Sequence, residues 1–148
     1  MEIDLILAAA HHLAIVTLIV LLAMEFALLR SGLSGADLRR LALIDAGYGA
    51  SAGIVIAIGV CRVIFGLKGP DFYIHNSWFW AKMASFAAIG LLSVPPTMTL
   101  LKWRRAYRAD AAFVAPDDGV KRLRRFVHAE VALLALVVIF AATMARYT

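Results

Sequence analysis

The fold is decided by residues 3–29, IDLILAAAHHLAIVTLIVLLAMEFALL. About 20 apolar residues in an α-helix cross the hydrocarbon core of a bilayer, so this stretch is long enough to span a membrane. Three further apolar stretches lie at approximately residues 41–65, 77–101 and 126–145. Backbone groups inside hydrocarbon must bond within their own segment, and the Leu, Ile, Val and Ala content favours helices. We expect an all-α membrane protein, a bundle of four transmembrane helices.

Composition agrees with a membrane protein that forms one domain over residues 1–148. The chain is 63% hydrophobic and 17% charged, far more apolar than soluble domains. Its single cysteine, Cys61, excludes an internal disulfide and any multi-cysteine metal site within one chain. The net charge is +5, but the basic residues lie between the apolar stretches, which argues against nucleic-acid binding.

The distribution of Lys and Arg predicts the orientation. The loops after the first and third stretches contain Arg30, Arg39, Arg40, Lys102, Arg104, Arg105, Arg108, Lys121, Arg122, Arg124 and Arg125. The opposite end has only Arg62, Lys68 and Arg146. The positive-inside rule predicts cytoplasmic basic loops and both termini outside, in a protein that crosses the membrane several times. The basic loops should meet anionic lipid headgroups, at about 1 kcal/mol per charge near the surface.

One charged residue, Lys82, lies early in the third apolar stretch. Burying an amine in hydrocarbon costs a few kcal/mol even on the mildest scale, so Lys82 needs a partner, a water-filled cavity or a ligand. The alternative is that Lys82 extends its amine back to the interface beside Trp78 and Trp80. On the functional interpretation, Lys82 is a candidate catalytic or cofactor-binding residue.

A group of polar residues is expected at the depth of Lys82, towards the outer face. Its other members are His11, His12, Arg62 and His75. Adjacent helical residues point about 100° apart, so only one of His11 and His12 can face the bundle. The spacing of His75, Trp78 and Lys82 predicts that these three lie on one helical stripe.

A second polar group is expected near the cytoplasmic side: Glu25, Asp45, His128 and Glu130. Asp45 and Glu130 have an alternative explanation, because carboxylates are favoured near helix N-termini. Glu25 lies near a helix C-terminus, where the dipole opposes it, and we expect it to pair with a loop arginine or with His128. His128 and Glu130 should point to nearly opposite faces.

The positions of the histidines constrain how this bundle could bind haem. Four-helix bundles often hold haem between helices with histidine as axial ligand. His128 is expected at the other membrane face, so the ligand would be His12 or His11. The second ligand would come from Lys82, His75, water or another subunit.

Several motifs resemble those of a bacterial family of four-helix integral membrane proteins with a domain of unknown function, which implies a multi-pass protein of the bacterial inner membrane. They are GPDFYIHNSWFWAKM at residues 69–83, AHHLA at residues 10–14 and MAR at residues 144–146. The layout is also similar, more distantly, to the four-helix membrane protoporphyrinogen IX oxidase and to the copper-resistance D family. The scattered methionines and the absence of a soft-ligand cluster make copper the weaker interpretation.

The similarity to the oxidase implies a functional pair formed by a histidine on the first helix and a lysine in a Trp-x-x-Ala-Lys context, with haem b bound. His12, or else His11, stands at the histidine position, and Lys82 at the lysine position. The doubled histidine and the intramembrane Glu25 depart from that pattern, and they bear on the oxidase reaction more than on the haem.

We therefore expect a haem b protein of electron transfer, or a membrane oxidoreductase, with the cofactor near the outer face and a quinone or another redox partner. His12 would be the axial ligand, and Lys82 the opposite ligand or the partner of a propionate or substrate. The candidate cofactor-binding residues are His11, His12, Arg62, His75, Trp78 and Lys82, with His11 and His12 as the metal ligands. The alternative is a redox-inactive transport module that moves protons or divalent ions through Lys82, Glu25, Asp45, His128 and Glu130.

Small residues along the second helix suggest a homodimer. They are Ala46, Gly49, Ala50, Gly53 and Ala57, which allow close approach of another helix. The alternative is that this face packs against the protein's own bundle.

Overall fold

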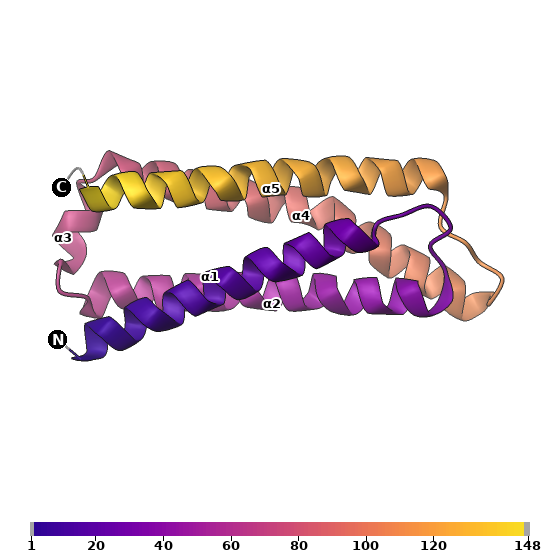
Figure 1. Cartoon of the computed structure of the whole chain (residues 1–148), viewed down its shortest axis with the longest axis horizontal. Helices are drawn as coiled ribbons and strands as arrows, with labels where there is room; N and C mark the ends of the chain where they lie inside the picture. The colour runs from indigo at the N-terminus through magenta and orange to yellow at the C-terminus, as the bar shows by residue number, and fades with distance from the viewer. Residues whose placement is uncertain (1, 147–148) are drawn as a thin grey trace.

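The structure, a computed structural model, describes residues 2–146. Within that range it has five helices: α1 (Glu2–Leu28), α2 (Gly35–Phe65), α3 (Gly69–Ile74), α4 (Ser77–Ala109) and α5 (Asp117–Arg146) (Figure 1). The described residues form no strand, only an isolated bridge between Ser34 and Val114. Four helices, α1, α2, α4 and α5, are long and apolar enough to cross a membrane. The expectation of an all-α protein with four membrane-spanning helices is confirmed.

Three of these helices extend beyond their apolar stretches. Helix α2 begins at residue 35 instead of 41, α4 ends at 109 instead of 101, and α5 begins at 117 instead of 126. The added turns are polar and basic, so a search for apolar residues does not count them, although their backbone remains helical. All three extensions lie at one end of the bundle, which we call the basic end. The opposite end, where α3 joins α2 to α4, is the α3 end.

The four long helices form two antiparallel hairpins. Helix α1 packs along α2 and α4 packs along α5, while contacts between α2 and α4 and between α1 and α5 join the pairs. The chain termini both lie at the α3 end (Figure 1). Which end faces the cytoplasm stays a prediction of the positive-inside rule.

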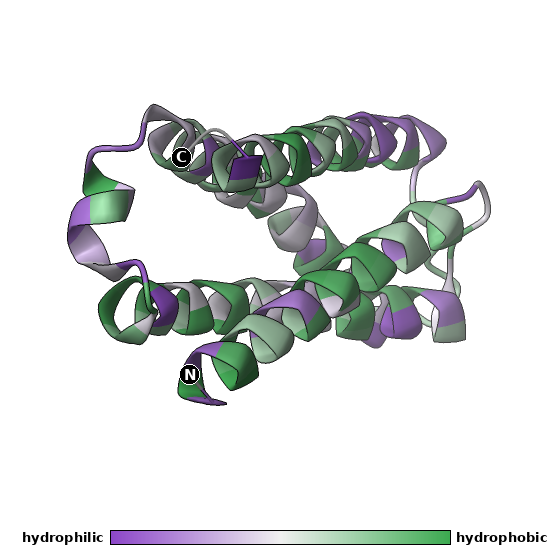
Figure 2. Cartoon of the chain, turned by 60° about the vertical axis from the view of Figure 1, so that its left-hand side comes forward, coloured by the Kyte–Doolittle hydropathy of each residue, from purple (hydrophilic) through white to green (hydrophobic). Residues whose placement is uncertain are grey.

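The buried core occupies the basic end and the middle of the bundle. Going from the α3 end, burial begins at Leu18 in α1, Val55 in α2, Ile89 in α4 and Val137 in α5. Beyond these positions, the described parts of the four long helices contain no buried residue. The hairpins diverge towards the α3 end (Figure 2). The fold is therefore held together away from the end where Lys82 lies.

Contacts between the two loops close the basic end. The backbone N–H of Ala115 donates to the carbonyl of Leu33 at 2.9 Å, and Arg124 Nη1 donates to the carbonyl of Leu29 at 2.7 Å. Leu29 and Leu33 are fully buried. Trp103 of α4 lies directly against Gly119 of α5, where an added β-carbon would stand 2.7 Å from the indole. The turns of the two hairpins are thereby fixed relative to one another.

The small-residue face of α2 is exposed along its whole length, from Ala46 to Ala57. A β-carbon added at Gly49 or Gly53 would meet nothing within 4 Å. The alternative that this face packs against the protein's own bundle is therefore wrong. The homodimer stays a prediction.

Candidate functional site

Three polar side chains from three helices gather near the α3 end: His11 of α1, Arg62 of α2 and Lys82 of α4. All three are half-buried. Arg62 and Lys82 are both within electrostatic reach of the His11 imidazole, and Arg62 is within reach of Lys82. We call this group the α3-end cluster.

Two buried polar atoms of the α3-end cluster have no partner among the described residues, His11 Nδ1 and Arg62 Nε. A buried polar atom left without a hydrogen bond costs about 1–3 kcal/mol. The imidazole lies against Gly59 of α2, where an added β-carbon would be 3.4 Å from His11 Cε1. The absence of a side chain at Gly59 therefore makes room for the ring.

The α3-end cluster has no acidic counterpart in the described part of the chain. The ion pair found among residues 2–146, Arg30 with Asp37, lies at the basic end. Asp4, at the α3 end, accepts a hydrogen bond from the backbone N–H of Leu67 at 3.3 Å. The Lys82 ammonium lies 5.3 Å from the centre of the Phe79 ring. The site thus carries uncompensated positive charge inside a membrane-spanning bundle.

The remaining histidines of the expected outer group lie apart from the cluster. His12 is exposed, with Nδ1 2.7 Å from the carbonyl oxygen of Ala8 in its own helix. His75 is exposed as well, with Nδ1 2.9 Å from the carbonyl oxygen of Asp71. Of the adjacent pair of histidines, His11 is the one that faces the other helices.

The predicted stripe of His75, Trp78 and Lys82 is wrong. His75 follows the last residue of α3, and α4 begins only at Ser77, so His75 does not continue the α4 helix. Trp78 stacks on Phe140 of α5, with ring centres 5.8 Å apart. Trp78 therefore helps hold α4 and α5 together at this end.

Three carboxyl side chains form a second group in the packed part of the bundle: Glu25 of α1, Asp45 of α2 and Glu130 of α5. Their exposed fractions are 2%, 6% and 1%. Asp45 and Glu130 are both within electrostatic reach of Glu25. We call this group the carboxyl cluster.

Two hydroxyl groups bond to the carboxyl cluster. The Tyr48 hydroxyl donates to Glu130 Oε2 at 2.8 Å, and the Thr97 hydroxyl donates to Asp45 Oδ1 at 2.9 Å. Glu25 has no hydrogen bond to its carboxyl group from any described residue. Sequence reasoning missed both hydroxyl partners, although Tyr48 follows Asp45 by three residues and so shares its helical face.

Comparison with known proteins places the chain in a family. The family described as "Predicted membrane protein (DUF2214)" matches residues 3–147. The chain belongs to this family. No curated protein and no solved structure matches. The expected resemblance to a membrane family with a domain of unknown function is thereby confirmed, and the family's description gives a membrane location without an activity.

The explanation of Asp45 and Glu130 by their position near helix N-termini is wrong for this DUF2214 protein. Asp45 and Glu130 are not near helix N-termini, because α2 begins at Gly35 and α5 at Asp117. The macrodipole therefore does not explain them, since its effect falls off within the first turn.

The expected cationic partner of Glu25 is also absent from the described residues. Arg124 donates to the carbonyl of Leu29 and lies 4.6 Å from the centre of the Phe26 ring. His128 is exposed and packs edge-on against the same ring, with centres 5.2 Å apart. Both side chains thus contact Phe26, the residue next to Glu25.

The arrangement limits which metal centres this DUF2214 protein can form from its own side chains. Residues 2–146 contain no group of three His, Cys, Asp or Glu side chains placed to hold a metal ion. A haem iron needs only one or two axial ligands from the protein, because the macrocycle supplies the others. A single histidine facing the interior is compatible with that requirement.

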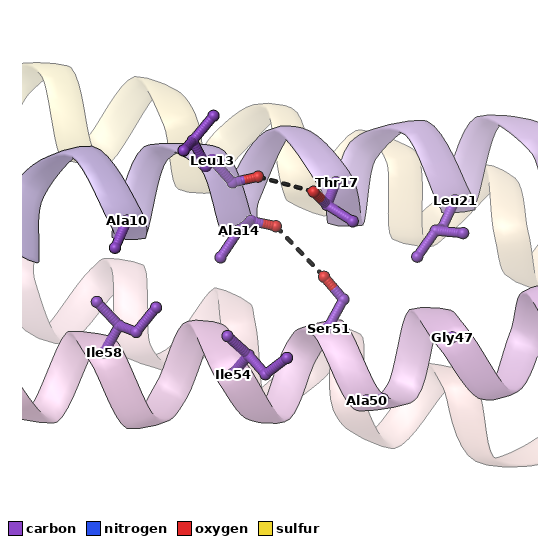
Figure 3. A pocket seen from close by; sticks show the side chains of 10 residues that line it. All are labelled: Ala10, Leu13, Ala14, Thr17, Leu21, Gly47, Ala50, Ser51, Ile54 and Ile58. Atoms are coloured by element: carbon purple, nitrogen blue, oxygen red, sulfur yellow. Dashed lines mark hydrogen bonds between the residues drawn. The ribbon is translucent and has the colours of Figure 1, made fainter.

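A shallow groove of about 460 Å³ runs between α1 and α2 on the bundle surface (Figure 3). Its two hydroxyl groups are already bonded to backbone carbonyls, Ser51 to Ala14 at 3.3 Å and Thr17 to Leu13 at 2.9 Å (Figure 3). The rest of its lining is apolar, including Leu21 and Ile54. The groove is suited to contact with lipid chains and contributes nothing to either cluster.

The Tyr48 hydroxyl bond predicts a loss of stability on removal. Tyr48→Phe deletes the donor to the buried Glu130 carboxyl and should lower the free energy of unfolding in detergent by about 1–3 kcal/mol. Tyr107→Phe is the matched control, because Tyr107 lies at the bundle edge near Gly35. Thermal unfolding followed by circular dichroism gives the comparison. Equal midpoints for the two variants would show that the Tyr48–Glu130 bond does not stabilise the bundle.

Proposed function

We propose that this protein binds haem b at the α3-end cluster and acts in electron transfer or as a membrane oxidoreductase. The observation that carries the proposal is the half-buried cluster of His11, Arg62 and Lys82, which has no acidic counterpart among the described residues. The cluster lies where the described parts of the long helices contain no buried residue, at the end towards which the two hairpins diverge (Figure 2). Haem b is flat and apolar, with two carboxylates at one edge. Its carboxylates complement the positive charge of the cluster, and its apolar body suits the part of the bundle where the described long helices have no buried core.

The roles follow from the chemistry of each side chain. His11 supplies a ring nitrogen to the iron, since its Nδ1 is buried without a partner and its ring faces the other helices. Arg62 binds one propionate, for which a guanidinium offers bidentate bonding. Lys82 binds the second propionate or serves as the opposite ligand. We assign the ligand role to His11 instead of His12, because the His12 ring is exposed and bonded to its own helix.

We propose that the cofactor is held at the outer side of a bacterial inner membrane, where the positive-inside rule places the α3 end. Phe79 and Trp78 supply aromatic surface beside Lys82, and Phe140 extends it from α5. Haem b supplies one-electron transfer when it is bound. A membrane-soluble quinone or another redox partner would exchange electrons with the haem.

A second candidate function is supported by the carboxyl cluster: redox-inactive transport of protons. Glu25, Asp45 and Glu130 are buried without a cation among the described residues, and carboxyl groups in membrane bundles mark proton pathways. Protons suit the cluster better than divalent ions, because the three carboxyl groups are not placed to ligate one metal. His11 and Glu25 are about 20 Å apart along α1, so the two clusters are separate sites.

The haem proposal predicts a coloured protein. Protein purified in detergent, from cells with adequate haem supply, should show a Soret band and the pyridine haemochrome spectrum of haem b. His11→Ala should lose most of this absorbance, because it removes the axial nitrogen. His12→Ala, the matched control, should keep the absorbance, because that ring is exposed.

A colourless wild-type protein would contradict the haem proposal and favour proton transport. Proteoliposomes carrying a pH-sensitive dye would then show proton flux that Glu25→Gln reduces. Loss of colour in His12→Ala with retention in His11→Ala would reverse the ligand assignment.

Substitutions at Lys82 separate its three roles. Lys82→Met keeps the stem and removes the amine, so either binding role predicts a shifted haem spectrum or weaker retention, worth about 1–3 kcal/mol. Lys82→Arg rescues a propionate-binding role, because it keeps the charge. It fails to rescue an iron-ligand role, because a guanidinium has no free lone pair. Wild-type spectra for both variants would indicate that Lys82 only extends to the interface.

A further inference from the structure

A groove of about 680 Å³ lies between α4 and α5 at the basic end. Three cations line it: Lys102 and Arg105 from α4 and Arg122 from α5. All three are exposed. None of the three has a carboxylate within 4.0 Å among residues 2–146, although Asp117 and Asp118 begin the same helix α5. The groove therefore offers concentrated positive charge to a ligand.

The deeper wall of the groove is apolar. Met98 lies about one turn further into the membrane than Lys102, and Leu101 about one turn further than Arg105; they are 63% and 41% exposed. The Thr99 hydroxyl, which also lines the groove, already donates to the carbonyl of Pro95 at 2.8 Å. No charged residue lines this deeper part. The groove is thus cationic at its outer end and apolar at its inner end.

Packing fixes the shape of the groove. Trp103 is only 6% exposed and lies against Gly119, whose missing side chain allows α5 to approach α4. Both residues line the groove as its floor. The apolar stretch of α4 ends at residue 101, so the three cations stand at the level of lipid headgroups. Tryptophan at this level is typical of a membrane interface.

We propose that this groove binds an anionic phospholipid, with its phosphate among Lys102, Arg105 and Arg122 and one acyl chain along Met98 and Leu101. The argument is charge complementarity at headgroup depth, combined with an apolar wall that continues into the hydrocarbon. A zwitterionic lipid brings its own cation and gains less from three positive side chains. The inference is independent of the haem proposal, because the groove and the α3-end cluster lie at opposite ends of the bundle.

The test compares two double variants that lose the same charge. Arg105→Gln with Arg122→Gln removes two groove cations, whereas Arg39→Gln with Arg125→Gln removes two exposed cations elsewhere at the basic end. Binding of phosphatidylglycerol and of phosphatidylcholine with the same chains to the full-length protein is measured by native mass spectrometry. The groove variant should bind phosphatidylglycerol about 10-fold more weakly, and the control should change by less than about 3-fold.

Each outcome decides the proposal. Equal weakening in both double variants would mean that the basic end attracts anionic lipid without a specific groove, and equal binding of the two lipids would also overturn the proposal. Competition by millimolar inorganic phosphate would indicate a free-anion site instead of a lipid site.

If the groove variant fails to fold by circular dichroism, Lys102→Gln against Arg39→Gln makes the same comparison with one charge. Leu101→Asn should weaken lipid binding without changing the charge, and unchanged binding would contradict the acyl-chain contact.

Discussion

Two hydrogen bonds from α2 tie the hairpins together inside the membrane. Tyr48 bonds to Glu130 of α5, and Asp45 accepts from Thr97 of α4, so one helix is linked to both members of the other pair. Lipid chains are as apolar as leucine, and helices in a bilayer therefore associate through packing and interhelical hydrogen bonds. The leucine-rich core packs near these bonds, of which Tyr48–Glu130 is buried and Thr97–Asp45 is part-buried. The helices are consequently joined at the middle and the basic end.

The α3 end differs from the rest of the bundle in its polar side chains. His11, Arg62 and Lys82 are half-buried there without a carboxylate partner among the described residues, which is costly in a membrane. Natural proteins retain destabilising residues where function requires them. Hydrogen bonds within the fold explain why Asp45 and Glu130 are buried. Glu25 is buried without a hydrogen bond to its carboxyl group from a described residue, and it supports the proton-transport alternative.

The sequence predicted the helices well because membrane-spanning helices need long apolar runs. It missed the polar turns at the basic end, and that error led to a wrong explanation of Asp45 and Glu130. Adjacent histidines on a helix cannot both face the interior, but the choice of His11 depends on the helix rotation that packing against Gly59 sets. The expected pairing of Glu25 with a loop arginine was wrong because Arg124 bonds to the backbone carbonyl of Leu29. Matching opposite charges along the sequence does not predict a bond to a backbone group.

The central claim is that the α3-end cluster serves a ligand and not the fold. The most direct measurement is the thermal unfolding midpoint, in detergent, of protein produced in haem-depleted cells. The account predicts that the combined variant His11→Leu, Arg62→Met and Lys82→Met unfolds at or above the wild-type temperature, because three unpaired polar groups are removed. Leu22→Ala, in the packed core, should unfold at a lower temperature. A midpoint of the combined variant well below that of wild type would contradict the account, since the cluster would then be part of what holds the bundle together.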